Sequence, residues 1–464
     1  MTNSAWRSRN QSRAGFQPAP EKQDARPTLA HGGWSRRRFV TAIATSTAAA
    51  AFLESPPAVL AKSSTKLFRT GSARPKVALL ATEVRRHSHA QHFIDRFLEG
   101  FGWQGRHHHP AVDLVSIYVD QFPDGDLSRD RAARHPVKIY PTIAEALTLG
   151  GPKLAVDGVV IIGEHGKYPR NEKGQTLYPR YKWFKEVMRV FEASGRVVPV
   201  FNDKHLSTDW SECVEMVADS KRLGFPFLAG SSLPVTWRIP SIEMPLNTRL
   251  GESVCVGYGG VDSYDFHGLE TAQCMSERRR GGEVGVKSVH AVRGIKIWDT
   301  LTKHESTMKL ASAAIFRSHT SKAPTGYTSF APVSALIPDS SPDAVAYFIE
   351  HRDGFKTTML LLNGFVQDFT YAGLDASGKI ISTQMHLPMP TRISTTADFF
   401  NPLVHHIENM ILTGIAPYPV ERTLLTSGMT LSAVDSLHRG QIRLDTPELN
   451  VAYRPATNSS FWRA

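Results

Sequence analysis

The sequence predicts an α/β protein in two parts. We expect an N-terminal Rossmann-like parallel sheet over 76–235 and a C-terminal α+β domain, built on an open, mostly antiparallel sheet, over 236–464. Two observations predict this fold class. In the first part, short apolar runs alternate with amphipathic runs, which is the pattern of βαβ units with a sheet buried on both faces. In the second part, strand-like runs dominate.

The N-terminus carries the pattern of an export signal. The pair Arg36-Arg37 precedes a modest apolar run, 39–53, which is shorter than the roughly 20 residues that span a bilayer. Small residues at 58–61 end this run as a cleavage site does. We therefore expect 1–61 to be a twin-arginine signal peptide and 62–75 a linker, with the mature chain periplasmic or secreted.

Strands and helices alternate through the first domain. Each strand is a short apolar run that ends at a polar loop. The expected strands are 77–81, 113–119, 137–140, 157–162, 197–201 and 226–229. The expected helices are 89–101, 128–135, 142–149, 182–194 and 211–223.

The second domain has longer strand-like runs and fewer helices. Asp353-Gly354 is a hairpin turn between two of the runs. The expected strands are 252–258, 284–292, 344–350, 357–362 and 365–371. The expected helices are 269–279, 402–412 and 420–437.

Composition narrows the class of partner. The net charge is +11, and after the leader Arg278–Arg280 is the one basic block that stands out. We interpret this block as a solvated helix end, and this interpretation argues against nucleic-acid binding. Cys213, Cys255 and Cys274 are too widely spaced for a zinc motif and predict buried thiols. We expect a small-molecule, carbohydrate-like substrate, no membrane contact after signal cleavage, and an open sheet that can pair with a second copy.

Polar loops follow the strands of the first domain, where an open parallel sheet binds its ligands. These loops are 82–89, 120–121, 164–168, 202–205 and 230–238. They contribute a set of imidazole and ammonium groups, His89, His165, Lys204 and His205. Such a cluster in one crevice is the default hypothesis for an active site.

Two chemistries suit this cluster. Lys204, partly desolvated beside Asp203, can carry protons to and from a hydroxyl or carbonyl group. Imidazole and carboxylate groups together also suit a divalent metal such as Zn, Mn or Fe, although no short signature such as H-E-x-x-H supports this alternative. The alternative metal ligands are Glu164, His165, His205 and His267.

Three stretches resemble the motifs of one known family. Residues 139–147 followed by 157–161 resemble the segment y-x-d-x-x-e-L-L … D-a-V, 198–205 is similar to k-P-V-x-x-E-K-P, and 266–270 resembles the helix start G-x-H-x-x-D. With this order of elements, the chain resembles the Gfo/Idh/MocA oxidoreductases over roughly 75–440.

The resemblance implies an oxidoreductase that acts on a sugar or a cyclitol with tightly bound NAD or NADP. Lys204 matches the lysine that works beside the nicotinamide and the substrate, and His267 and Glu270 would face the substrate across the domain boundary. The implied catalytic residues are Lys204, His267, His205 and Glu270. The implied cofactor-binding residues are Thr82, Arg85, Asp120, Glu164 and His165.

The first loop departs from the family's pattern. Residues 81–90 contain no glycine, whereas the family's loop uses glycines for a tight turn and close approach to pyrophosphate. Arg85 and Arg86 would have to bind phosphate by their side chains. Two alternatives therefore stand beside the oxidoreductase: a cofactor-independent or metal-assisted carbohydrate lyase, hydrolase or epimerase, and a non-catalytic sugar-binding protein.

Overall fold

The computed structural model describes residues 73–322, 341–390 and 397–461, all within the compact unit Ser64–Ala464. The expected signal peptide, 1–61, lies outside the described residues, and export stays a prediction. Among the helices of the described part, none combines the length and the apolar character that crossing a bilayer requires.

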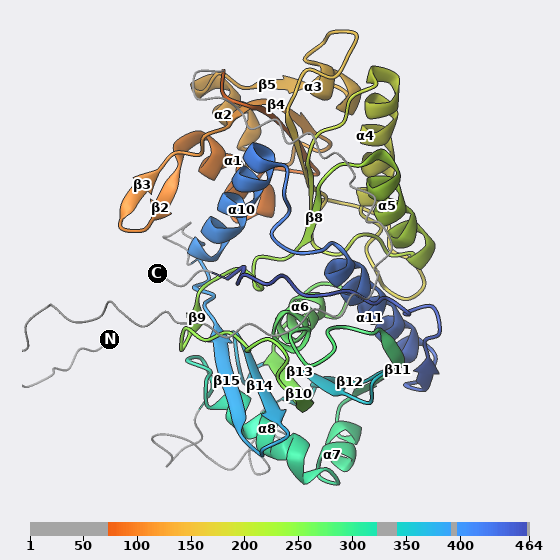
Figure 1. The fold of residues 1–464 in the computed structure, drawn as a ribbon. Helices are drawn as coiled ribbons and strands as arrows, with labels where there is room; N and C mark the ends of the chain where they lie inside the picture. Colours follow the sequence, from red (N-terminus) through yellow and green to blue (C-terminus); the bar gives the residue numbers. More distant parts are fainter. Residues whose placement is uncertain (1–72, 323–340, 391–396, 462–464) are drawn as a thin grey trace, which may run out of the picture. The chain divides into compact units, whose positions relative to one another are not determined.

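A six-stranded, fully parallel sheet forms the N-terminal part (Figure 1). Across the sheet its strands are β5 (Lys138–Tyr140), β4 (Asp113–Val119), β1 (Lys76–Ala81), β6 (Gly158–Ile162), β7 (Val200–Asp203) and β8 (Phe227–Gly230). Numbered along the chain this is the order 3-2-1-4-5-6 of the doubly wound fold, whose switch point lies between β1 and β6. The predicted Rossmann-like sheet is confirmed.

Helices cover both faces of this sheet, which explains why its strands are apolar throughout. Ala78 and Leu80 face one layer, and Val77 and Leu79 face the other. The first layer holds α3 (Ile143–Thr148), α4 (Arg180–Ser194) and α5 (Trp210–Leu223). The second holds α1 (His89–Glu99), α2 (Ser128–Arg134) and α10 (Asn401–Thr413).

Helix α10 comes from the far end of the chain, yet it packs on the first sheet. Gly158 of β6 leaves room for it: a Cβ there would lie 2.6 Å from Cδ1 of Ile411. Arg96 of α1 donates to Asn401 Oδ1 at 2.7 Å and to the carbonyl of Ala397 at 2.7 Å. The sequence pattern finds this helix but assigns it to the domain 236–464. The structure shows that the core of the first sheet draws on both ends of the chain.

The second sheet has eight strands and is antiparallel except where β10 pairs with β13, as predicted. Its order is β16 (Arg443–Asp445), β11 (Val286–Arg293), β12 (Val345–His351), β13 (Lys356–Leu361), β10 (Leu250–Gly257), β14 (Phe369–Asp375), β15 (Ile380–Met385) and β9 (Arg238–Ile239). Gly354, at φ +83°, makes the predicted turn between β12 and β13. The sequence pattern does not detect β9, β15 or β16.

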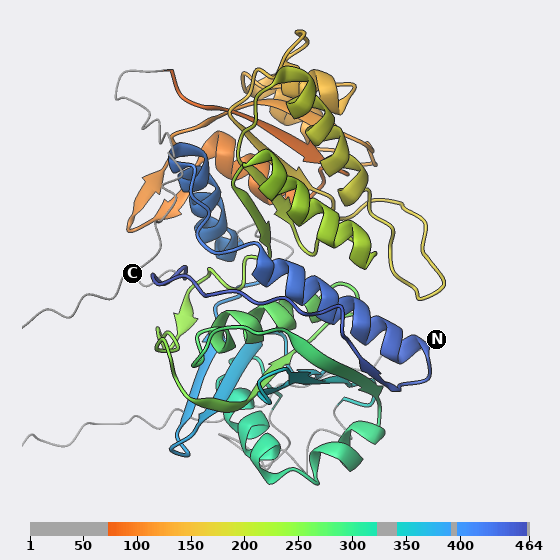
Figure 2. The same ribbon diagram turned by 45° about the vertical axis from the view of Figure 1, so that its right-hand side comes forward.

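Helices also cover both faces of the second sheet. One face carries α6 (Asp265–Ser276) and α11 (Glu421–His438), and the other carries α7 (Lys296–Leu301) and α8 (Glu305–Ile315), two helices that the sequence analysis does not assign. Figure 2 shows α11 running between the helices of the first sheet and the strands of the second, and the same apolar cluster includes residues of both sheets.

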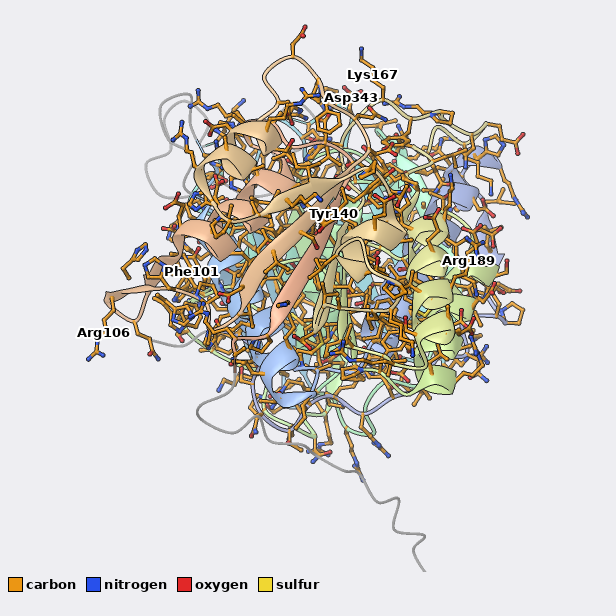
Figure 3. The ribbon with its side chains drawn as sticks, turned by 90° about the horizontal axis from the view of Figure 1, so that it is seen from above. Phe101, Arg106, Tyr140, Lys167, Arg189 and Asp343 are labelled. Carbon is orange, nitrogen blue, oxygen red and sulfur yellow. The ribbon has the colours of Figure 1, made fainter. Side chains whose placement is uncertain are left out.

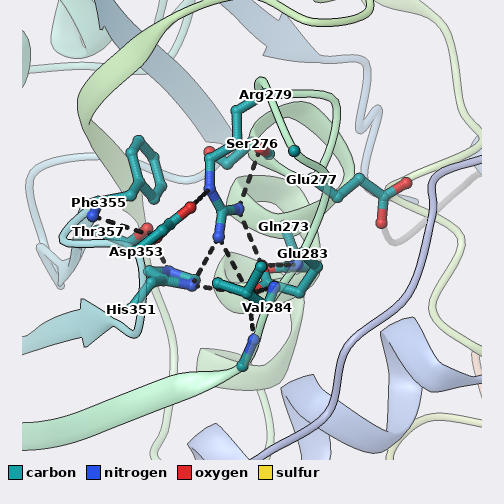
Figure 4. Close-up of polar contacts among 12 residues, drawn as sticks. Gln273, Ser276, Glu277, Arg279, Glu283, Val284, His351, Asp353, Phe355 and Thr357 are labelled. Carbon is teal, nitrogen blue, oxygen red and sulfur yellow. Dashed lines mark hydrogen bonds and ion pairs between the residues drawn. The ribbon is translucent and has the colours of Figure 1, made fainter.

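A buried ionic network closes the end of α6 against β11 and β12 (Figure 4). Arg279 Nη1 lies 2.9 Å from Glu283 Oε2, and His351 Nδ1 lies 3.1 Å from Glu283 Oε1. Arg279 Nε also pairs with Asp353 at 2.8 Å. The interpretation of 278–280 as a solvated helix end is therefore wrong for its first two arginines, which are buried. The three cysteines are free and buried, as expected.

Candidate active site

The switch point between β1 and β6 carries the residues that the sequence places in one crevice. The hydroxyl of Thr82, just after β1, donates to the backbone carbonyl of Glu164, just after β6, and so ties the two strand ends together. His165 has φ +72° and Lys204 has φ +68°, in the left-handed region where residues other than glycine are uncommon. Such strained positions concentrate at functional sites.

A cavity of about 80 Å³ opens between the carboxyl edge of the parallel sheet and the start of α6. Its polar lining residues are His89, Glu164, His165, Lys204, Ser232, Tyr264 and His267. Its apolar lining residues are Leu233, Phe369, Leu387, Met389, Phe399 and Phe400. Both sheets and the segment before α10 contribute to it, so the cavity lies between the two halves of the fold.

Lys204 and His267 meet in this cavity. Lys204 Nζ lies 2.7 Å from His267 Nε2 and 3.6 Å from Glu164 Oε1, and its side chain is only 5% exposed. Burial, reinforced by the charge of Lys204, holds the pKa of His267 well below 6.5, and its imidazole is neutral. Burial acts to raise the pKa of Glu164, but the surrounding positive charges, Lys204 foremost, together outweigh it and keep that pKa below its usual range. The site therefore contains an ammonium–carboxylate pair joined to a neutral imidazole.

His89 and Asp203 form a second polar pair in the same place. His89 Nδ1 lies 2.7 Å from Asp203 Oδ2, and the Asp203 side chain is 1% exposed. A carboxylate that accepts from Nδ1 fixes the tautomer and leaves Nε2 as the ring's proton acceptor. The ring of Phe400 packs 5.0 Å from that of His89, centroid to centroid. His89 is the first residue of α1, next to the switch point, and it lines the cavity as the sequence analysis expects.

His165 is also held neutral. Burial lowers the pKa of His165 to about 3. The charge of Glu164 acts to raise this pKa, and nearby basic groups act to lower it further. Arg85 lies beside it, with Nη2 3.4 Å from His165 Nδ1, while Arg85 Nε pairs with Glu83 at 2.5 Å. The Arg85 side chain, 41% exposed, lies outside the cavity lining.

Two of the four expected catalytic residues are not brought to the cavity. His205 is 2% exposed, neither of its ring nitrogens has a hydrogen-bond partner, and Nε2 lies 3.7 Å from Asp262. Glu270 is fully buried one turn further along α6, where it accepts from the Thr426 hydroxyl at 2.8 Å. Burial raises the pKa of Glu270 to about 7. Lys204 and His267 are the expected catalytic residues that share the cavity.

The expected metal set does not gather around one point. Glu164, His165 and His267 line the cavity and His205 does not. Within the described residues, the compact group of potential ligands lies elsewhere, at His108, His405 and Glu408.

The loop after β1 does not fit a dinucleotide in the way that a glycine-rich loop does. Val84 in this loop is fully buried in the apolar cluster under α1, and its carbonyl accepts from Leu127 at 2.8 Å. Phe400 covers the start of α1 by stacking 5.1 Å from His92. Asp120, the expected ribose ligand, instead accepts from Tyr118 and Tyr168, each at 2.7 Å.

The fold and the cavity define a doubly wound α/β protein with a second, mostly antiparallel sheet and a polar site between them. No family model and no curated protein matches the chain. Among solved structures it is similar to GenD2 from gentamicin A biosynthesis in complex with NAD, at 13% identity and a TM-score of 0.49, over 82% of this chain and 99% of that one.

It is also similar to myo-inositol dehydrogenase from Lactobacillus casei in complex with NAD(H) and myo-inositol, at 10% identity, TM-score 0.48, and 82% and 99% coverage. A probable dehydrogenase from Thermotoga maritima matches at 11% identity, TM-score 0.48, and 81% and 99% coverage. Inositol dehydrogenases are the kind of enzyme that the sequence motifs resemble. Identities and TM-scores this low support no statement about the activity of this chain.

Proposed function

We propose that this chain is an enzyme that transfers protons at a hydroxyl-bearing carbon of a sugar or a cyclitol. The observation that carries the proposal is the 2.7 Å contact between Lys204 Nζ and His267 Nε2 in the cavity. Because the imidazole of His267 is neutral, its Nε2 accepts a hydrogen bond from the ammonium of Lys204. Such a pair acts as the acid or the base for a substrate hydroxyl or carbonyl oxygen.

The lining of the cavity suits a small polyol. Among the lining residues, Ser232, Lys204 and His267 offer hydrogen bonds, and Leu233 and Phe369 offer apolar surface. A sugar or cyclitol ring has the same two kinds of surface, hydroxyl groups at its rim and C–H groups on its faces. Glu164 balances the charge of Lys204, so the site does not require a charged ligand.

An NAD-type dinucleotide is the cofactor that the family resemblance implies, and it would accept or supply hydride. The first loop, with Val84 buried under α1 and no glycine from 81 to 90, does not fit its pyrophosphate. This misfit favours a second candidate, a lyase or epimerase that uses proton transfer alone. Such a reaction needs two acid–base groups, and His89, oriented by Asp203, supplies the second beside Lys204 and His267.

A test of proton transfer does not need the substrate to be known in advance. The full chain is incubated in D2O with a panel of sugars, cyclitols and their keto derivatives, with and without NAD or NADP, and deuterium incorporation and nicotinamide absorbance are followed. We expect turnover of at least one compound, reduced at least about 100-fold in Lys204→Met and in His89→Gln. If no compound turns over or shifts the melting temperature, the proposal is wrong.

A second measurement separates an NAD-dependent oxidoreductase from a lyase or epimerase that works without a dinucleotide. The full chain is purified without added cofactor and denatured, and the released material is analysed for nicotinamide by absorbance and mass. We expect no dinucleotide, and no change in melting temperature when NAD or NADP is added. Stoichiometric release would identify the chain as a dehydrogenase with an unusual phosphate site.

We also propose, from Arg36-Arg37 and the apolar run after it, that the chain is exported by the twin-arginine route. Replacing both arginines by lysine should leave the chain in the cytoplasmic fraction. Unchanged export would contradict the proposal.

A further inference from the structure

We propose that His108, His405 and Glu408 form a binding site for a divalent metal of the zinc class, separate from the cavity. None of the three lines the cavity, and the proposal does not depend on the function proposed for it. His405 and Glu408 stand one turn apart on α10, and His108 belongs to the hairpin of β2 (Phe101–Trp103) and β3 (Arg106–His108).

The three side chains converge on one point. His108 Nε2 lies 2.7 Å from Glu408 Oε2, and His405 Nδ1 lies 3.5 Å from the same oxygen. One ligand atom from each residue falls within 4.8 Å of the others. In Figure 3, Arg106 marks the outer tip of the hairpin and Phe101 lies at its inner end, so the hairpin brings His108 back towards α10.

Two imidazoles and a carboxylate are a donor set that zinc takes with a fourth position left open to water. Bonds of about 2.0–2.2 Å in a tetrahedron place ligand atoms about 3.4 Å apart. The two observed distances from Glu408 Oε2 to the histidine nitrogens, 2.7 Å and 3.5 Å, lie on either side of this value. Small side-chain rotations would bring all three ligand atoms to the separation that zinc requires. Soft thiolate ligands are absent from the group, which favours zinc over copper(I).

The surroundings hold two of these groups in place. Glu408 Oε1 accepts from the backbone N–H of Ala111 at 2.6 Å, which turns Oε2 towards both histidines. The ring of Trp103 packs 4.6 Å from that of His405, centroid to centroid. Outer contacts of this kind orient the ligands of protein metal sites.

One buried atom is left without a partner. His405 Nδ1 is buried and makes no hydrogen bond, despite its 3.5 Å approach to Glu408. Buried polar atoms in native proteins nearly always have a partner. A metal ion would supply one, and would at the same time fasten the hairpin to α10.

The test uses the full chain, purified with a tag that contains no histidine and freed of metal with a chelator. Zinc chloride is titrated by calorimetry, and cobalt chloride by visible absorbance. We expect one ion per chain, a tetrahedral cobalt spectrum and a rise in melting temperature with zinc. His405→Ala and Glu408→Gln should each weaken zinc binding by at least the roughly 10–100-fold that loss of an outer-shell partner costs.

His109→Ala is the matched control, because this exposed histidine follows β3 directly and is not one of the three ligands. Its zinc affinity should equal that of the unchanged chain. Glu408→Gln keeps an oxygen for Ala111, so it guards against misfolding as the cause of a loss. Absence of binding, or equal affinity in all variants, would show that the three residues form a hydrogen-bond network only.

Discussion

At the scale of single residues, the backbone decides which polar groups share the cavity. Lys204 takes a left-handed conformation, so its side chain and that of the next residue diverge: Lys204 enters the cavity and His205 enters the protein interior. The sequence places both after one strand and cannot show this turn. Likewise His267 lines the cavity, whereas Glu270, one turn on, meets α11.

Lys204→Met should remove activity and also lower stability, because it leaves the Glu164 carboxylate, 11% exposed, without its cation. Removing one member of a buried pair costs about 3–5 kcal/mol. The double variant Lys204→Met/Glu164→Gln should recover most of the free energy of unfolding, measured in urea at pH 7, but none of the activity. A double variant that regains turnover would exclude Lys204 from the chemistry.

Glu270 should make the protein less stable as the pH rises. Its pKa is about 7 in the folded state against 4.5 ordinarily, so the folded state binds the extra proton between these values. The stabilisation is complete below pH 4.5 and is lost as the pH rises through 7. Glu270→Gln mimics the protonated form. Between pH 5 and 8 its free energy of unfolding should therefore rise relative to that of the unchanged chain, by roughly 3 kcal/mol at most. Parallel pH profiles of unfolding would contradict the raised pKa.

At the scale of elements, the sequence pattern identifies most strands and helices but not where they dock. The first domain is predictable because βαβ units have strong periodicity and short connections. Strands β9 and β16 are missed because they have two and three residues, too few to show a period. The sequence does not predict that Phe369, Leu387 and Phe400 line the cavity, because they belong to segments far along the chain from the loops that follow the parallel strands.

The end of α6 depends on the ion network around Glu283, whose side chain is 0% exposed. Arg279→Met should lower the free energy of unfolding by about 3–5 kcal/mol, because Glu283 stays buried with less compensation. The matched control is Lys287→Met, which removes an exposed partner of Glu350 on the same sheet and should change stability by at most about 1 kcal/mol. Equal effects in urea unfolding would show that burial does not strengthen the network.

At the scale of the whole molecule, the described chain folds as a unit whose halves share their cores. Helix α11 belongs to the apolar cluster that contains residues of both sheets, and α10 completes the far face of the first sheet. The sequence boundary at 235 marks where the chain first leaves the parallel sheet, and the later return of α10 is a long-range contact that no local pattern encodes. The cavity is therefore assembled only when both ends of the chain are in place.

The packing of α10 on β6 can be measured by a double-mutant cycle. Gly158→Ala introduces a Cβ 2.6 Å from Ile411 Cδ1, and Ile411→Ala opens a hole at the same contact. We expect losses of about 1–3 kcal/mol for the first change and 2–5 kcal/mol for the second. The double variant should lose less than the sum by about 0.5–3 kcal/mol, because the new methyl group occupies the space left by Ile411. The control pair is Gly158→Ala with Leu403→Ala, also on α10, for which the two losses in free energy of unfolding should simply add. If the losses add in both pairs, α10 does not pack on β6 in solution.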